Sequence, residues 1–177
     1  MITKIISGGQ TGADRGGLDA AIHCKLPHGG WCPKGRKAVD GSIPLDYHLT
    51  EMASKKYLPR TQANVLNADA TIIFTYGPLS GGSLKTATYA HHLEKPHHEV
   101  DLLRTTPEKA VVEIMRWLAG DETLNDYDEY VVYPPMTCVL NVAGSRESHA
   151  PGIQETVFRV MMDVLIKVNP AFKKFYQ

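Results

Sequence analysis

The chain alternates short β-branched runs with amphipathic stretches, and this alternation restricts its fold more than any other feature. The β-branched runs predict strands at 2–6, 26–31, 70–76, 97–103 and 137–143. Apolar residues that recur every three to four positions predict helices at 11–25, 83–94, 107–119 and 152–168. Such alternation is typical of a parallel sheet covered on both faces. We therefore expect an α/β fold with an open, doubly wound, mainly parallel sheet of about five strands flanked by helices.

The length and charge of the chain narrow the number of domains and the class of partner. A closed barrel needs eight strands and about 250 residues, more than the 177 present, so we expect one domain over 1–177. The 19 Lys and Arg balance the 19 Asp and Glu, whereas proteins that grip duplex nucleic acid usually carry a basic excess. No stretch approaches the roughly 20 apolar residues of a membrane span. The cysteines Cys24, Cys32 and Cys138 are too scattered for a disulfide framework. We expect a cytoplasmic protein with neither a nucleic-acid nor a membrane partner.

The sharpest motif is the glycine-rich segment SGGQTGADRGG at 7–17, which follows the first predicted strand and opens the first helix. In an open parallel sheet, ligands bind outside the carboxyl ends of the strands. Glycines there let the backbone approach a ligand closely, and the first free N–H groups of the helix suit an anion. The alternative interpretation is a tight turn that needs glycine only for its backbone angles. The candidate ligand-binding residues are Gly8, Gly9, Gln10, Thr11, Gly12 and Asp14.

Two further glycine-bearing turns follow predicted strands, at 77–83 and 143–148. The last turn carries Arg146, whose guanidinium fork suits a phosphate or a carboxylate. The alternatives are a plain helix cap at Ser83 and a solvated surface arginine at Arg146. Because all three turns follow strands, we expect them to converge on one crevice that holds a small phosphorylated or oxyanionic ligand. The candidate binding residues of these two turns are Gly81, Gly82, Ser83, Thr86, Gly144, Ser145 and Arg146.

Further polar residues lie in the loop after the second strand and at the start of a short helix. Lys34 and Arg36 would add positive charge above the crevice, and Arg60 and Asn64 would add hydrogen-bonding groups, although all four also suit an exposed surface. The histidine pairs at 91–92 and 97–98 lack metal-ligand spacing, because neighbouring side chains on a helix or a strand point apart. We therefore expect no dedicated protein metal site.

Five segments together resemble the "putative molybdenum carrier" family: SGGQTGADRGGLDAAI (7–22), HGGWCPKGR (28–36), RTQANVLNADATIIFT (60–75), GPLSGGSLKT (77–86) and NVAGSRES (141–148). That family is similar to the molybdenum-cofactor carrier of algae and belongs to the Rossmann-like superfamily of lysine-decarboxylase-like (Lonely guy, SLOG) proteins. The resemblance looks like a circular permutation, because a turn like that at 144–146 comes first in Lonely guy chains and last here. It implies a Rossmann-like fold, a homo-oligomer (dimer or tetramer), and binding of molybdenum cofactor (molybdopterin) or of a nucleotide.

The resemblance leaves two functions open. Lonely guy proteins carry a catalytic glutamate in a PGGxGTxxE motif, but the comparable segment here, SGGSLKTAT (80–88), has no glutamate. The first hypothesis is therefore a carrier that holds a phosphorylated pterin or a nucleotide without turnover. The alternative is a nucleotide-processing, base-releasing hydrolase of the phosphoribohydrolase type. In that enzyme Asp14, Glu147 or Asp101 would stand in as the general acid or base.

Overall fold

The centre of the molecule is a five-stranded parallel sheet, which confirms the expected fold class. The computed structural model describes residues 1–120 and 132–175, with side chains as far as 172. Each pair of neighbouring strands is parallel, in the order β2-β1-β9-β7-β8. The strands are β1 (Ile2–Ile6), β2 (His28–Gly29), β7 (Ala70–Thr75), β8 (His97–Asp101) and β9 (Cys138–Gly144).

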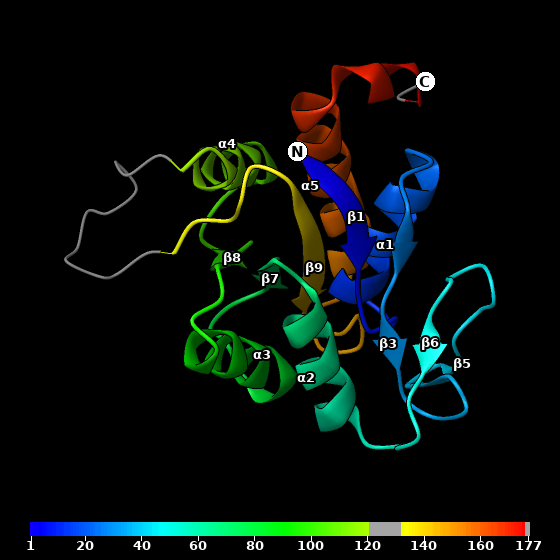
Figure 1. Ribbon diagram of the computed structural model, residues 1–177. Coiled ribbons are helices and arrows are strands. Elements are labelled where there is room, and N and C mark those ends of the chain that lie inside the picture. The colour runs from blue at the N-terminus through cyan, green and yellow to red at the C-terminus, as the bar shows by residue number, and fades with distance from the viewer. Residues whose placement is uncertain (121–131, 176–177) are drawn as a thin grey trace.

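Helices cover both faces of this sheet. In Figure 1, α2 and α3 lie on the viewer's side, α1 and α5 lie behind, and α4 packs beside α5. The apolar core lies between these layers, with Phe74, Leu140 and Ile153 among its fully buried side chains. The helices are α1 (Ala13–His23), α2 (Tyr57–Asn67), α3 (Gly81–His92), α4 (Pro107–Leu118) and α5 (Ile153–Val168), followed by the short 3-10 helix η2 (Pro170–Phe175).

The connections of the sheet create a switch point at β9. The chain passes from β1 through α1 to β2 on one side of β9, and from β7 through α3 to β8 on the other side. Doubly wound sheets bind ligands outside the carboxyl ends of the strands where the order reverses in this way. The carboxyl ends of β1, β9 and β7 are adjacent, at the lower side of the sheet in Figure 1.

The segment between β2 and α2 differs most from the expectation. The predicted strand at 26–31 is wrong in its length, because Gly30 (φ +120°) turns the chain out of the main sheet after two residues. Two small sheets follow, and this segment packs Cys32, Ala38, Ile43 and Leu49 against Leu18 of α1 in a second core. These sheets pair β3 (Trp31–Cys32) with β6 (Thr50–Glu51), and β4 (Lys37–Ala38) with β5 (Gly41–Ser42).

Two glycines let α1 pack closely against its neighbours. A Cβ on Gly16 would lie 2.5 Å from the carbonyl oxygen of Gln154 in α5, and one on Gly17 would lie 2.6 Å from Cβ of Val142 in β9. No helix in the described parts of the chain is long and apolar enough to cross a bilayer.

Replacing Gly17 by alanine should therefore lower the free energy of unfolding by about 1–3 kcal/mol, the usual cost of overpacking a core. Gly82→Ala is the matched control, because a Cβ there meets nothing within 4 Å. Urea unfolding of the two variants and the wild type measures the difference. Equal stability of both variants would contradict the close packing of α1 on β9.

A partly buried histidine makes stability depend on pH. His98 of β8 stacks on Trp117 of α4 with ring centroids 5.4 Å apart, and burial lowers the pKa of His98 to about 4. In the unfolded chain the histidine titrates near its ordinary pKa of about 6.5. The unfolded state thus binds the proton more readily, so this contribution is complete above about pH 6.5 and is lost as the pH falls towards 4.

We expect the wild type to lose about 2 kcal/mol more of unfolding free energy than His98→Phe between pH 7 and pH 5. Phenylalanine preserves a ring that can stack on Trp117 but does not titrate. Denaturant unfolding at the two pH values measures the difference. Parallel losses in the two proteins would contradict the assignment of this pH dependence to His98.

Candidate functional site

The first and third glycine turns meet at the carboxyl end of the sheet. We call the turns 7–12, 76–80 and 145–152 the carboxyl rim. The N–H of Ala13 donates to the carbonyl of Ser145 (3.1 Å), and the N–H of Glu147 donates to the carbonyl of Thr11 (3.3 Å). A Cβ on Gly12 would lie 2.4 Å from the same Ser145 oxygen. The expected convergence is therefore confirmed for these two turns.

The second turn is connected to the others less directly. The N–H of Ser145 donates to the carbonyl of Phe74, next to the end of β7 (2.9 Å). However, the hydroxyl of Ser83 donates to the carbonyl of Ser80 (2.8 Å), and that of Thr86 donates to the carbonyl of Gly82 (2.9 Å). Both hydroxyls thus serve the first turn of α3. The role of Gly81, Gly82, Ser83 and Thr86 in binding stays a prediction.

Four consecutive backbone N–H groups that lead into α1, those of residues 10–13, have protein partners. Gln10 N–H donates to Oδ2 of Asp14 (3.2 Å), and Thr11 N–H donates to Oε1 of Gln10 (3.0 Å). Gly12 N–H donates to Oε1 of Gln154 (3.3 Å), and Ala13 N–H donates to the third turn. The N–H groups of residues 10–13 are therefore engaged by oxygens of the protein, and the role of this turn in binding an anion stays a prediction.

Packing explains most glycines of the first turn. Gly9 (φ +72°) lies against Leu49, with 2.4 Å between an added Cβ and Cδ1. Gly12 lies against the third turn, and the two glycines inside α1 pack as described above. Gly8 differs, because its added Cβ would lie 2.0 Å from Nη1 of Arg60. Among these glycines, Gly8 therefore makes room for a charged side chain from α2.

A buried ion pair lies beside Gly8. Asp14 is only 4% exposed, and its Oδ2 accepts the Gln10 N–H and lies 3.2 Å from Nη1 of Arg60. Burial raises the pKa of Asp14, while the positive charges of Arg60, Arg146 and Arg15 partly oppose this rise. The pair places one negative charge among several positive ones at the carboxyl rim.

Three cations surround the ring of Tyr57, the first residue of α2. The guanidinium carbon of Arg146 lies 5.1 Å from the ring centroid, Nζ of Lys37 lies 5.6 Å from it, and the guanidinium carbon of Arg60 lies 6.0 Å from it. We call Tyr57, Lys37, Arg60 and Arg146 the Tyr57 cluster. Sequence reasoning missed Tyr57 and Lys37. Tyr57 lies three residues before the candidate Arg60 and so on the same helix face, and this spacing is the signal that could have identified it.

Three buried polar atoms near this cluster have no hydrogen-bond partner. They are Nε2 of Gln10, Oγ1 of Thr11 and Nε of Arg60, and among the described residues only Nε2 of His98 shares this state. Buried polar groups are normally paired, so such atoms point to a missing ligand or water. Two of the three belong to N–H donors, which require acceptor oxygens. The arrangement suits an oxygen-rich anion.

Arg36 and Asn64, which the sequence also singled out, hold the scaffold. Arg36 donates to the carbonyls of Ile43, Leu49, Pro44 and Tyr47, so its guanidinium fastens the second core. The amide of Asn64 accepts from the N–H of Trp31 (2.8 Å) and donates to its carbonyl (3.0 Å), which fixes the chain after β2. Lys34 is exposed.

Two carboxylates that we considered as catalytic groups cap turns instead. Glu147 accepts the N–H groups of Gly152 and Gln154 at the start of α5. Asp101 accepts the N–H groups of Gly77 (2.7 Å) and Leu103 (3.0 Å). Of the three candidate acids, Asp14 alone lies next to the Tyr57 cluster through its contact with Arg60. Among the described residues, no group of three or more His, Cys, Asp or Glu could hold a metal ion.

Comparison with known proteins identifies the family. The model of the circularly permutated YpsA SLOG family matches residues 5–165. The chain belongs to this family. The geometry agrees with a permuted SLOG chain, because β9, the last described strand in sequence, is the central strand of the sheet, and the start of β1 and the helix η2 lie toward the same end of the molecule in Figure 1.

A solved structure is similar to this chain over nearly its whole length. A protein from Syntrophus aciditrophicus SB, named "Putative molybdenum carrier protein", is 41% identical to this chain with a TM-score of 0.81. The match covers 93% of this chain and 95% of that one. A comparison with curated proteins finds no match.

Proposed function

We propose that this SLOG protein is a carrier that binds a small phosphorylated ligand at the carboxyl rim and releases it unchanged. The ligand is a pterin such as molybdopterin, carried as cargo, or a nucleotide. The observation that carries the proposal is the set of unpaired donors of Gln10 and Arg60 beside the cations of the Tyr57 cluster. A phosphate offers several acceptor oxygens and a negative charge to such donors. The name of the Syntrophus relative supports molybdenum cofactor as the cargo.

One observation favours a second function, a base-releasing nucleotide hydrolase. Asp14 is a buried carboxyl group whose pKa is raised by burial, and buried acids of this kind serve as general acids in enzymes. Its contact with Arg60 and its hydrogen bond from Gln10 oppose protonation, however, because both stabilise the carboxylate. Glu147 and Asp101 offer no substitute, since both cap backbone N–H groups. We therefore prefer the carrier.

Native mass spectrometry of freshly purified protein, combined with elemental analysis for molybdenum, tests the proposal. We expect a bound phosphorylated small molecule that leaves intact when the protein is denatured. Incubation with nucleoside 5′-monophosphates should then release no free base in a chromatographic assay. Base release that Asp14→Asn abolishes would establish the hydrolase instead. Protein without bound cargo that also fails to bind added nucleotide or molybdopterin would contradict both functions.

A further inference from the structure

We propose that the Tyr57 cluster selects ligands by charge: Lys37, Arg60 and Arg146 act together as a clamp for a dianionic group. This inference rests on the proposed function and goes further, because it names the charge that the cargo presents and adds Lys37 to the site. The three cationic groups come from β4, α2 and the third turn, and each lies within 6.0 Å of one ring centroid. Segments distant in sequence thus bring positive charge to one point.

The hairpin that carries Lys37 is fastened to the first turn. The N–H of Val39, two residues after Lys37, donates to Oε1 of Gln10 (3.0 Å). Asp40 makes two hydrogen bonds to the guanidinium of Arg15, at 2.6 and 2.9 Å. The Lys37 side chain is exposed. The contacts of Val39 with Gln10 and of Asp40 with Arg15 hold the backbone of its hairpin beside the carboxyl rim. The fold therefore fixes the backbone from which the Lys37 side chain reaches the Tyr57 ring.

The charges around Tyr57 do not balance. Asp14 is the carboxylate that pairs with a member of the cluster, through Arg60, while Arg15 next to it is already neutralised by Asp40. The Glu147 carboxylate, one residue after Arg146, keeps its negative charge, but its two oxygens are engaged by the N–H groups of Gly152 and Gln154. The three cations and the Asp14 carboxylate alone sum to a charge of +2, and a phosphate monoester carries about −1.5 to −2 at neutral pH. A single carboxylate or another monoanion would leave part of this charge uncompensated.

Gln10 supplies an independent indication that a ligand belongs here. Gln10 is only 3% exposed. Its Oε1 accepts hydrogen bonds from the N–H groups of Thr11 and Val39, whereas its buried Nε2 has no hydrogen-bond partner. The N–H of the same residue and Nη1 of Arg60 share one oxygen of Asp14. An anion bound next to Gln10 and Arg60 would accept hydrogen bonds from their unpaired nitrogens. Its negative charge would also compensate the positive charge of the clamp.

Tyr57 is the positioning residue of the clamp. An aromatic face attracts cations, so the ring gathers three side chains that otherwise repel one another. Tyr57→Phe keeps this face, whereas Tyr57→Leu removes it. We expect Tyr57→Phe to retain the dianion affinity of the wild type and Tyr57→Leu to reduce it about fivefold.

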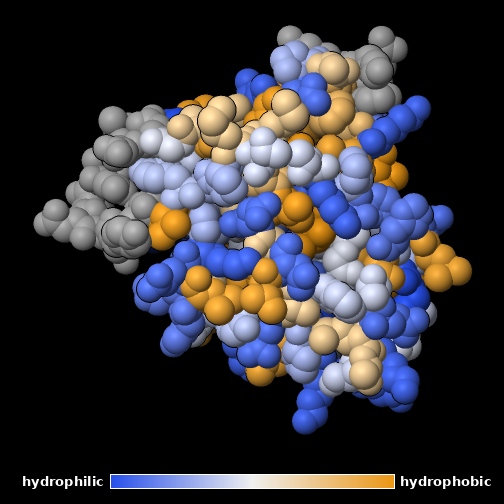
Figure 2. All heavy atoms as spheres, in the orientation of Figure 1, coloured by the Kyte–Doolittle hydropathy of each residue, from blue (hydrophilic) through white to orange (hydrophobic). Residues whose placement is uncertain are grey.

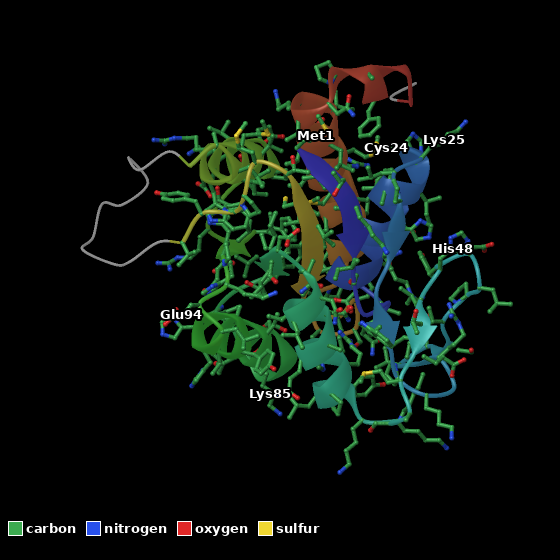
Figure 3. All side chains as sticks on the ribbon, viewed as in Figure 1. Met1, Cys24, Lys25, His48, Lys85 and Glu94 are labelled. Carbon is green, nitrogen blue, oxygen red and sulfur yellow. The ribbon has the colours of Figure 1, made fainter. Side chains whose placement is uncertain are left out.

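Isothermal titration calorimetry with molybdate and perrhenate tests charge selection, because both are tetrahedral oxyanions of similar size and their charges are −2 and −1. We expect the wild type to bind molybdate at least about tenfold more tightly than perrhenate. Lys37→Gln should lower molybdate affinity about fivefold and perrhenate affinity less. Lys85→Gln, which removes the exposed lysine of α3 labelled in Figure 3, is the control and should change neither.

Equal affinity for the two oxyanions, or Lys37→Gln indistinguishable from Lys85→Gln, would overturn the clamp. Adenosine 5′-monophosphate as a third titrant separates this failure from a failure of the carrier function. If the affinity for the nucleotide falls in Arg146→Ala but not in Lys37→Gln, the binding site is supported and the clamp is wrong. If the nucleotide, molybdopterin, molybdate and perrhenate all fail to bind, the proposed function itself is wrong.

Discussion

Replacing Gly144 by alanine should destabilise the protein by about 3–5 kcal/mol, the largest stability loss that we expect from any single substitution here. Gly144 has φ +152°, and an added Cβ would lie 1.9 Å from the carbonyl oxygen of Phe74 and 2.9 Å from Cβ of Ala13. The Phe74 oxygen also accepts the N–H of Ser145 (2.9 Å), which joins the third turn to β7. The neighbour is backbone, so it has no side-chain rotation with which to move away.

Gly35→Ala is the matched control for this substitution. Gly35 also has a positive φ (+76°), but a Cβ there meets nothing within 4 Å. It therefore carries only the cost of a left-handed backbone, about 1–2 kcal/mol. Guanidinium-induced unfolding of both variants separates the two costs. Similar losses of unfolding free energy in Gly35→Ala and Gly144→Ala would contradict the close contact between Gly144 of β9 and the backbone of β7.

Replacing Arg146 by alanine should weaken the binding of adenosine 5′-monophosphate by about 100-fold, with little change in stability. A charge-assisted hydrogen bond contributes about 1.5–3 kcal/mol, and 1.4 kcal/mol corresponds to a factor of ten. The described contact of the guanidinium is the face of Tyr57, which leaves its N–H groups available to a phosphate. Calorimetric titration measures the affinity, and thermal melting checks the fold.

Arg159→Ala is the control for Arg146. Arg159 lies on the exposed side of α5 and pairs with Glu155 one turn away (2.7 Å). Its removal changes the net charge of the protein by the same amount as removal of Arg146. Equal losses of affinity in the two variants would indicate a general charge effect and would argue against a site at the third turn.

Much of the sheet was predictable because its strands are long enough to show a pattern. Residues 70–75 are all buried and mostly β-branched, and Gly77 follows soon after them. The apolar run and the turn residue after it both indicate a strand. The two-residue strands at 31–51 carry no such pattern. Their arrangement depends on tertiary contacts, above all the four carbonyls that Arg36 gathers, which no local signal announces.

The site was predictable only in part. Strand order brings the first and third turns together, and the guanidinium of Arg146 reaches the rim as its position after the last strand suggested. The packing roles of Gly9, Gly12, Gly16 and Gly17 could not be foreseen, because the atoms they lie against belong to segments that are distant in sequence.

The clamp residues were harder to foresee. Lys37 and Tyr57 come from different elements, and only the folded chain shows that they meet. Hydrophilic side chains project from the lower edge of the face shown in Figure 2, so a charged residue near the rim does not stand out by polarity alone.

A crystal structure of the protein with adenosine 5′-monophosphate tests the central claim most directly. The account predicts the phosphate next to Arg146 and Arg60, with one of its oxygens accepting a hydrogen bond from the now unpaired Nε of Arg60 or Nε2 of Gln10. Nucleotide bound elsewhere, for example at the amino end of the sheet near Met1 and Cys24 (Figure 3), with both nitrogens still unpaired, would contradict it.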